Sequence, residues 1–200
     1  RATLDLNQAL NIKPNYTVVF NIRGLAYVGK GDTDRAIQDF DQAIRLDPKF
    51  AVGYYNRGEA YQTKGDYDRA IYDFDQAIKI NPNYEAAYYN RGLTYSGKRD
   101  FERAIADFAQ VIRLEPKNPY AFYNRGFTYQ NKGDTDRAIA DYSQAIKLDD
   151  KFTLAYYNRG NGLAERREFD RAIADFDQSL KLNPNDLLAL HSRGLAYYHK

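Results

Sequence analysis

The chain is 200 residues long, and its 29 Lys and Arg residues balance 27 Asp and Glu residues to a formal net charge of +2. So small an excess of positive charge argues against nucleic acid or an anionic membrane as a partner. Cysteine is absent, which excludes disulfides, thiolate metal sites and cysteine nucleophiles, and no apolar stretch approaches the roughly 20 residues that span a bilayer.

One dipeptide, Arg-Gly, returns at a constant interval along the whole chain. It occurs at Arg23-Gly24, Arg57-Gly58, Arg91-Gly92, Arg125-Gly126, Arg159-Gly160 and Arg193-Gly194. A fixed period between about 20 and 50 residues is typical of a solenoid, in which one small unit stacks on copies of itself. We therefore expect a protein that works through a long surface and not through a catalytic pocket.

Residues 1–16 carry the second half of the repeating unit. Pro14 stands at the place that Pro48 takes in the next unit, and Leu6 stands at the place of Phe40. This register predicts a helix over residues 2–12 that has no preceding partner helix.

Residues 17–50 are the first complete unit, and they predict two amphipathic helices, over 17–30 and 34–46. Asp32 can cap the second helix, and Pro48 ends it before the next unit. Spacings of three and four residues place two trios on helix faces: Phe20, Gly24 and Tyr27 on the first helix, and Ala36, Phe40 and Ala43 on the second.

Four more complete units follow with the same pattern, and a half unit ends the chain. The complete units cover residues 51–84, 85–118, 119–152 and 153–186, and residues 187–200 are a first helix without its second. Nothing in the sequence divides these units into separate domains, so we expect one continuous array.

This pattern of aromatic, Gly, Tyr, Ala and Pro residues resembles the tetratricopeptide repeat family over the whole chain. Arg at the seventh place of each unit is a departure, because the family more often has Leu there. The resemblance implies an all-α fold of about twelve helices, in which antiparallel helix pairs form an α-solenoid with a right-handed superhelix. It also implies a concave groove lined by the first helix of each pair, and a role in binding other proteins through peptide segments.

Both ends of the sequence fall at the same inter-helix turn, and neither has the polar cap that an isolated solenoid needs. We expect the sequence to be a fragment of a longer tetratricopeptide repeat array. We also expect weak head-to-tail self-association, in which helix 187–200 of one molecule packs on helix 2–12 of the next.

Two columns of side chains are candidates for the groove, since the resemblance implies that the fifth and sixth places of each unit face it. An Asn amide can pair with the N–H and C=O of an extended peptide, and Tyr offers a large contact area with a polar tip. Alternatively, each Asn bonds a neighbouring helix and the rings fill gaps between units. The candidates are Asn56, Asn90, Asn124, Asn158, Tyr55, Tyr89, Tyr123 and Tyr157.

Arg at the seventh place and Asp at the twenty-third form two structural columns. The planar Arg fork suits a carboxylate, so we predict Arg–Asp pairs between helices. If Asp5 pairs with Arg23 and each later Asp pairs with the Arg of the following unit, every member has a partner, and this is the preferred register. Pairing within each unit would leave Asp5 and Arg193 without partners. The columns are Arg23, Arg57, Arg91, Arg125, Arg159 and Arg193, and Asp5, Asp39, Asp73, Asp107, Asp141 and Asp175.

No cofactor, metal site or catalytic group is expected. The acidic Asp-x-Asp segments, such as Asp134-Thr135-Asp136, stand where second helices begin and read as helix caps. The leading hypothesis is a non-enzymatic scaffold that holds an extended segment of a protein partner in its groove. The alternatives are the substrate-recognition arm of a larger enzyme and a structural spacer.

Overall fold

The computed structural model describes residues 2–200, with side chains from residue 3 onward. All regular structure in this range is helical, and the described residues form twelve α-helices and no strand. The predicted all-α solenoid of antiparallel helix pairs is therefore confirmed. Two compact units divide the chain at residues 98 and 99, and each is described by itself below.

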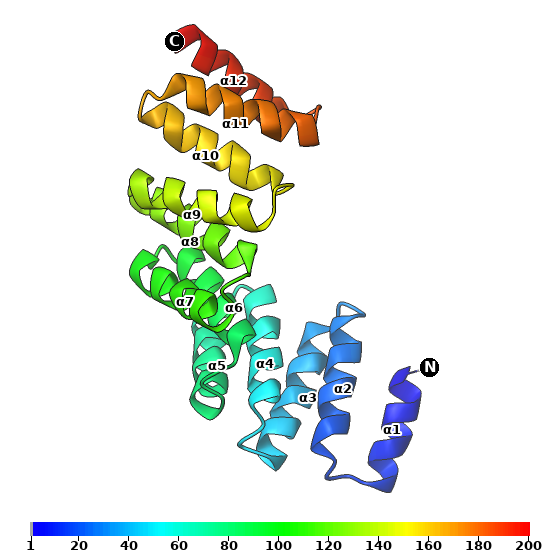
Figure 1. Ribbon diagram of the computed structural model, residues 1–200. Helices are drawn as coiled ribbons and strands as arrows, with labels where there is room; N and C mark the ends of the chain where they lie inside the picture. Colours follow the sequence, from blue (N-terminus) through cyan, green and yellow to red (C-terminus); the bar gives the residue numbers. More distant parts are fainter. Residues whose placement is uncertain (1) are drawn as a thin grey trace. The chain divides into compact units, whose positions relative to one another are not determined.

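The N-terminal unit contains six helices, which pack consecutively along the chain (Figure 1). We call the even-numbered helices first helices and the odd-numbered helices second helices. The bounds are α1 (Ala2–Ile12), α2 (Thr17–Val28), α3 (Thr33–Leu46), α4 (Ala51–Thr63), α5 (Tyr67–Ile80) and α6 (Glu85–Gly97).

The C-terminal unit contains the remaining six helices in the same consecutive packing. Within each unit, neighbouring first helices also touch each other, as α2 touches α4 and α8 touches α10. The bounds are α7 (Phe101–Leu114), α8 (Pro119–Lys132), α9 (Thr135–Leu148), α10 (Thr153–Glu165), α11 (Phe169–Leu182) and α12 (Leu187–His199).

Tight turns connect the two helices of each pair, and their chemistry explains the helix boundaries. Gly31 has φ +75°, a left-handed conformation that favours glycine. Directly after it, the Asp32 carboxylate accepts a hydrogen bond from the Arg35 backbone N–H at 3.1 Å and so caps α3. Asp66, Asp100 and Asp134 cap their second helices in the same way.

The core of each pair lies where an aromatic ring meets a glycine. Phe40 on α3 is fully buried, and a Cβ added to Gly24 on α2 would lie 2.5 Å from its ring. Phe40 also packs with Ala36 and with Ala60 of α4, so α3 is held between two first helices. The opposite face of the first helices lies outside this packing.

Candidate binding surface on the first helices

The asparagine column connects neighbouring first helices. The Asn56 Nδ2 group on α4 donates to Asn21 Oδ1 on α2 at 2.7 Å, and Asn56 is only 6% exposed. The Asn90 Nδ2 group on α6 donates to the Tyr55 hydroxyl at 2.9 Å and to Glu59 Oε1 at 3.1 Å. These are the neighbouring-helix contacts that the alternative interpretation of the column predicts.

The C-terminal unit repeats this connection once. The Asn158 Nδ2 group on α10 donates to the Tyr123 hydroxyl on α8 at 3.0 Å. The Asn124 Nδ2 group donates to the backbone carbonyl of Tyr120 in its own helix at 2.9 Å. Asn56, Asn90 and Asn158 thus connect adjacent first helices within their units.

One side of two of these amides remains available to a ligand. Within residues 2–200, no group donates a hydrogen bond to the Oδ1 oxygen of Asn90 or Asn158. Since no buried side-chain oxygen of the described residues lacks a partner, both oxygens reach the surface. Each amide can therefore donate inward to a tyrosine and accept outward from a peptide N–H.

The tyrosine column fills the spaces between helices. The ring of Tyr55 lies 6.0 Å from the Phe74 ring and 5.1 Å from the Tyr84 ring, measured between centroids. Burial and the nearby Glu59 carboxylate raise the pKa of the Tyr55 phenol. The Tyr55 side chain is half-buried, and its ring packs against rings of the neighbouring helices.

Tyr123 and Tyr157 of the C-terminal unit are placed in the same way. The Tyr123 ring lies 5.8 Å from Tyr142 and 4.9 Å from Phe152, and burial raises the pKa of its phenol. The Tyr157 ring lies 6.1 Å from Phe176. Tyr89, the fourth member, is half-buried on α6.

Exposed apolar side chains provide a second element of the surface. In the N-terminal unit, α2 leaves four of them in solvent, three of which are spaced by four and three residues, and α4 adds another. In the C-terminal unit, α8 leaves two in solvent and α10 adds a third. We call these sets the N-terminal row (Val18, Ile22, Leu25 and Val52) and the C-terminal row (Tyr120, Phe127 and Leu154), and their members are 41–56% exposed.

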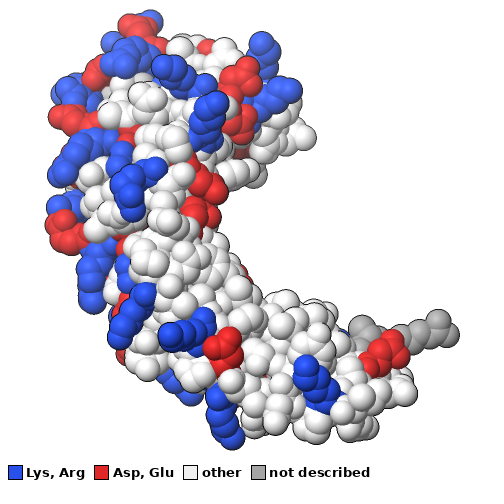
Figure 2. All heavy atoms as spheres, turned by 60° about the horizontal axis from the view of Figure 1, so that its bottom comes forward, with Lys and Arg blue, Asp and Glu red and all other residues white. Residues whose placement is uncertain are grey.

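Sequence reasoning did not name Val18 or Leu25 as groove residues. The signal was present, because Val18 holds the place in its unit that Val52 holds in the next, and Leu25 lies on the same face of its helix. Figure 2 shows a broad surface with few charges over the N-terminal unit, in the lower right of the view. This face of the N-terminal unit therefore offers little charge to a partner.

In four helix pairs, the arginine of the first helix binds the aspartate of the second helix. Arg23 Nε and Nη2 donate to the two carboxylate oxygens of Asp39 at 2.7 and 2.6 Å. The same two-bond fork joins Arg57 to Asp73, Arg125 to Asp141 and Arg159 to Asp175.

The preferred register, with Asp5 bound to Arg23, is therefore wrong. The fork turns toward the second helix of its own pair because the close approach at Gly24 brings α3 against α2. The remaining Arg23 Nη1 group does reach back to α1, but it donates to Asn7, two residues beyond Asp5, at 2.8 Å. Arg57 likewise reaches back to Asp41 at 2.6 Å.

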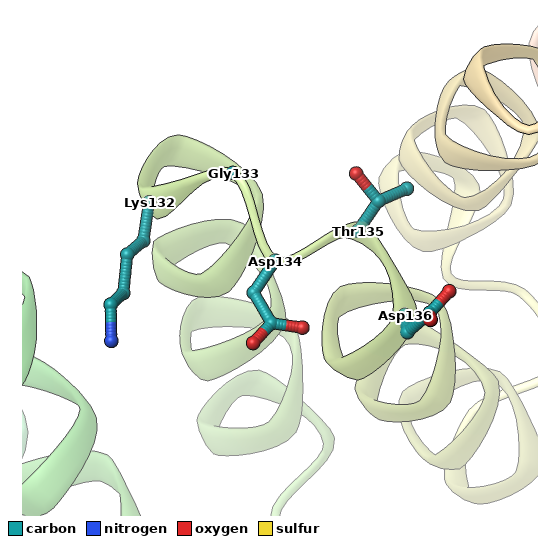
Figure 3. A pocket seen from close by; sticks show the side chains of 5 residues that line it. All are labelled: Lys132, Gly133, Asp134, Thr135 and Asp136. Carbon is teal, nitrogen blue, oxygen red and sulfur yellow. The ribbon is translucent and has the colours of Figure 1, made fainter.

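The acidic turns cap helices and do not converge on a common point. Figure 3 shows the shallow depression at the α8–α9 turn, where the Asp134 and Asp136 carboxylates point in different directions. Asp134 accepts from the Arg137 backbone and side chain, which lowers the pKa of its carboxyl group, and Asp136 pairs with Arg166. Within the described range, His, Asp and Glu residues form no group of three that could hold a metal ion.

The described helices include none that combines the length and the apolar character required to cross a membrane.

Sequence comparison gives matches to one family along most of the chain. No curated protein matches the sequence. One profile described as Tetratricopeptide repeat matches residues 51–84, 119–152 and 153–186, a second matches residues 74–106, and a profile described as TPR repeat matches residues 24–65 and 99–133.

Three solved structures illustrate the likeness in fold. YrrB, a TPR protein with an unusual peptide-binding site, superimposes with a TM-score of 0.81 at 21% identity, over 94% of this chain and 97% of its own. MamA from Desulfovibrio magneticus RS-1 gives 0.80 at 20% identity, over 86% and 97%. TTC0263, a thermophilic TPR protein in Thermus thermophilus, gives 0.64 at 19% identity, over 92% and 100%. With matches that span more than half of its length and a shared fold, this chain belongs to the tetratricopeptide repeat family.

Proposed function

We propose that the chain is a non-enzymatic protein-interaction scaffold that binds an extended, uncharged segment of a partner protein along its first helices. The observation that carries the proposal is the pair of apolar rows that the fold leaves in solvent. Contact with a partner would remove this apolar surface from water, which is favourable. The YrrB structure adds support, because a protein of the same fold has a peptide-binding site.

The chemistry of the surface favours recognition of the partner's peptide backbone. The Oδ1 oxygens of Asn90 and Asn158 can accept peptide N–H groups, and the apolar rows can receive alternate side chains of an extended segment. Since the net charge of the chain is only +2, we expect apolar content and not charge to select the partner.

A displayed library of random peptides, selected on the immobilised chain, tests the proposal. We expect enriched peptides to be apolar and extended, and the double variant Phe127→Ala, Leu154→Ala or the double variant Val18→Ala, Leu25→Ala to weaken them about tenfold or more. Tyr72→Ala on α5 is the matched control, because Tyr72 is 57% exposed on a second helix. Absence of enrichment would favour a structural spacer.

A pair of variants then separates the contribution of the Asn158 amide to binding from that of the Tyr123 hydroxyl to which it donates. Asn158→Ala removes the outward oxygen and the inward bond, whereas Tyr123→Phe removes only the inward bond. If Asn158 accepts a peptide N–H, Asn158→Ala weakens binding and Tyr123→Phe does not. Equal losses from both variants would assign the column a purely structural role.

A further inference from the structure

The residue directly before a first helix is aromatic at four turns of the chain. The Tyr84 ring lies 5.1 Å from the Tyr55 ring of α4, measured between centroids. The Phe152 ring lies 4.9 Å from the Tyr123 ring of α8, and Phe152 is only 9% exposed. At these two turns the chain thus supplies its own ring to pack against a first helix. The four aromatic residues are Tyr16, Phe50, Tyr84 and Phe152.

The α7–α8 turn and the α11–α12 turn have a polar residue at this position. Asn118 precedes α8, and its Oδ1 oxygen accepts hydrogen bonds from the backbone N–H groups of Tyr120 and Ala121 at 3.0 and 3.3 Å. Asp186 caps α12 in the same way. Both turns therefore have a polar helix cap where the other four have an aromatic ring.

At the α7–α8 turn, the surface has a pocket with a mainly apolar lining. Pro116 and Pro119 contribute walls whose φ angles are fixed. The Tyr120 ring lies 5.1 Å from the buried Phe152 ring, which supports a third wall, although Tyr120 itself is 56% exposed. Walls that are already in place bind a side chain at a low entropic cost. The lining residues are Glu115, Pro116, Lys117, Asn118, Pro119 and Tyr120.

The chemistry of this pocket matches an uncharged aromatic side chain. Tyr120 offers a ring against which a second ring can stack, and the two prolines add apolar contact. Glu115 and Lys117 are both exposed and carry opposite charges that offset each other. An aromatic side chain is also what the chain itself places before the first helix at four other turns.

We propose that the α7–α8 pocket receives one aromatic side chain of the segment that the C-terminal row binds. Tyr120 belongs to both the pocket and the row, so a segment on the row reaches the pocket without leaving the surface. The partner thereby supplies the ring that Asn118 does not. This inference rests on the proposed function and describes the partner more closely, as an apolar segment with Phe, Tyr or Trp near one end of the bound stretch.

An NMR titration of the isotopically labelled chain with N-acetyl-tryptophanamide tests the pocket without a partner protein. We expect chemical-shift changes at the backbone amides of Lys117, Asn118 and Tyr120, and none there from N-acetyl-alaninamide at the same concentration. Tyr120→Ala removes one wall and should abolish the changes that the tryptophan probe causes at Lys117 and Asn118. Shift changes concentrated on other helices, or equal changes from both probes, would overturn the proposal.

A substitution that fills the pocket from within tests its role in peptide binding. Asn118→Phe gives the α7–α8 turn a ring like that of Phe50, which precedes α4 without a side-chain cap, so the variant should fold. Peptides selected on the chain should bind this variant about tenfold more weakly. Asp186→Phe is the matched control, because it removes the same kind of cap and adds the same ring at another turn, and it should leave peptide affinity unchanged. The fluorescence of a Trp-bearing peptide measures these affinities, since the chain itself contains no Trp.

Failure of the pocket and failure of the proposed function give different results. Selected peptides without an aromatic residue would overturn the pocket and leave the C-terminal row as the binding surface. Peptides that bind Asn118→Phe as tightly as the unsubstituted chain would do the same. If no peptide is enriched but the tryptophan probe still shifts the amides of Lys117 and Asn118, the proposed function fails and the pocket remains a site for an aromatic group.

Discussion

Asn90 on α6 donates its Nδ2–H to the hydroxyl oxygen of Tyr55 on α4, across 2.9 Å and 35 residues of sequence. The same amide group reaches Glu59 at 3.1 Å. One side chain thus fixes the distance between two neighbouring first helices. The surface that we propose for peptide binding is consequently also part of what holds the stack together.

Replacing Asn90 by Ala should lower the free energy of unfolding by about 1–2 kcal/mol, because two hydrogen bonds are lost and one of them goes to a carboxylate. Urea denaturation measures the change. Asn131→Ala is the control, since Asn131 is exposed near the end of α8 and makes no side-chain bond within the described residues. Equal stability of the two variants would mean that the Asn90 bonds contribute nothing.

Glycine-to-alanine substitutions should have opposite effects in the middle and at the end of the array. At Gly58, the new Cβ would lie 2.8 Å from the buried Phe74 ring, so overpacking of about 1–3 kcal/mol exceeds the ~1 kcal/mol gained in helix propensity. At Gly194, no described atom lies within 4 Å of that position, and only the gain remains. Thermal denaturation should therefore show Gly58→Ala destabilised and Gly194→Ala stabilised, and a shift of both variants in one direction would contradict this packing.

Arg57→Gln should be strongly destabilising. Asp73 is 1% exposed and relies on the Arg57 fork, and a buried carboxylate left without its cation costs about 3–5 kcal/mol. Arg69→Gln is the matched control, because Arg69 pairs with Asp66 in solvent and such exposed pairs contribute little. Urea midpoints for the two variants should differ clearly, and similar midpoints would show that the buried fork is not a structural requirement.

Tyr142 should make the protein sensitive to alkaline pH. Burial raises the pKa of its phenol, so the folded state keeps the proton while the unfolded chain loses it near pH 10. The unfolded state then binds fewer protons, and the free energy of unfolding falls as pH rises above about 10. Tyr142→Phe supplies the ring that the equivalent Phe40, Phe74 and Phe176 have, and it should lose less stability between pH 8 and pH 11 than the unsubstituted chain. A parallel loss in both proteins would contradict the assignment to Tyr142.

The sequence was sufficient to predict the helices, because one repeat period carries the apolar faces, the caps and the breaks together. The first predicted pair, 17–30 and 34–46, is found as Thr17–Val28 and Thr33–Leu46. Helix 2–12 is found as Ala2–Ile12. Differences of one or two residues arise where the Gly31 turn takes over from the helix.

Side-chain pairing could not be predicted from the same period. Asp39 follows Arg23 and Asp5 precedes it at nearly equal separations in the sequence, so spacing alone allows either pair. The close contact of Phe40 with Gly24 decides between them, and that contact depends on interhelical distance. The sequence likewise placed Asn90 on the face of a first helix but could not assign its Nδ2 group to Tyr55. That hydrogen bond depends on the distance between two helices, which the spacing of residues in the sequence does not give.

The most direct test of the binding surface is an NMR titration of the isotopically labelled chain with a peptide selected on it. The account predicts chemical-shift changes concentrated on the first helices, at the N-terminal row or the C-terminal row and at the side-chain amide of Asn90 or Asn158. Shift changes concentrated on second helices, around Tyr72 or Leu182, would contradict it.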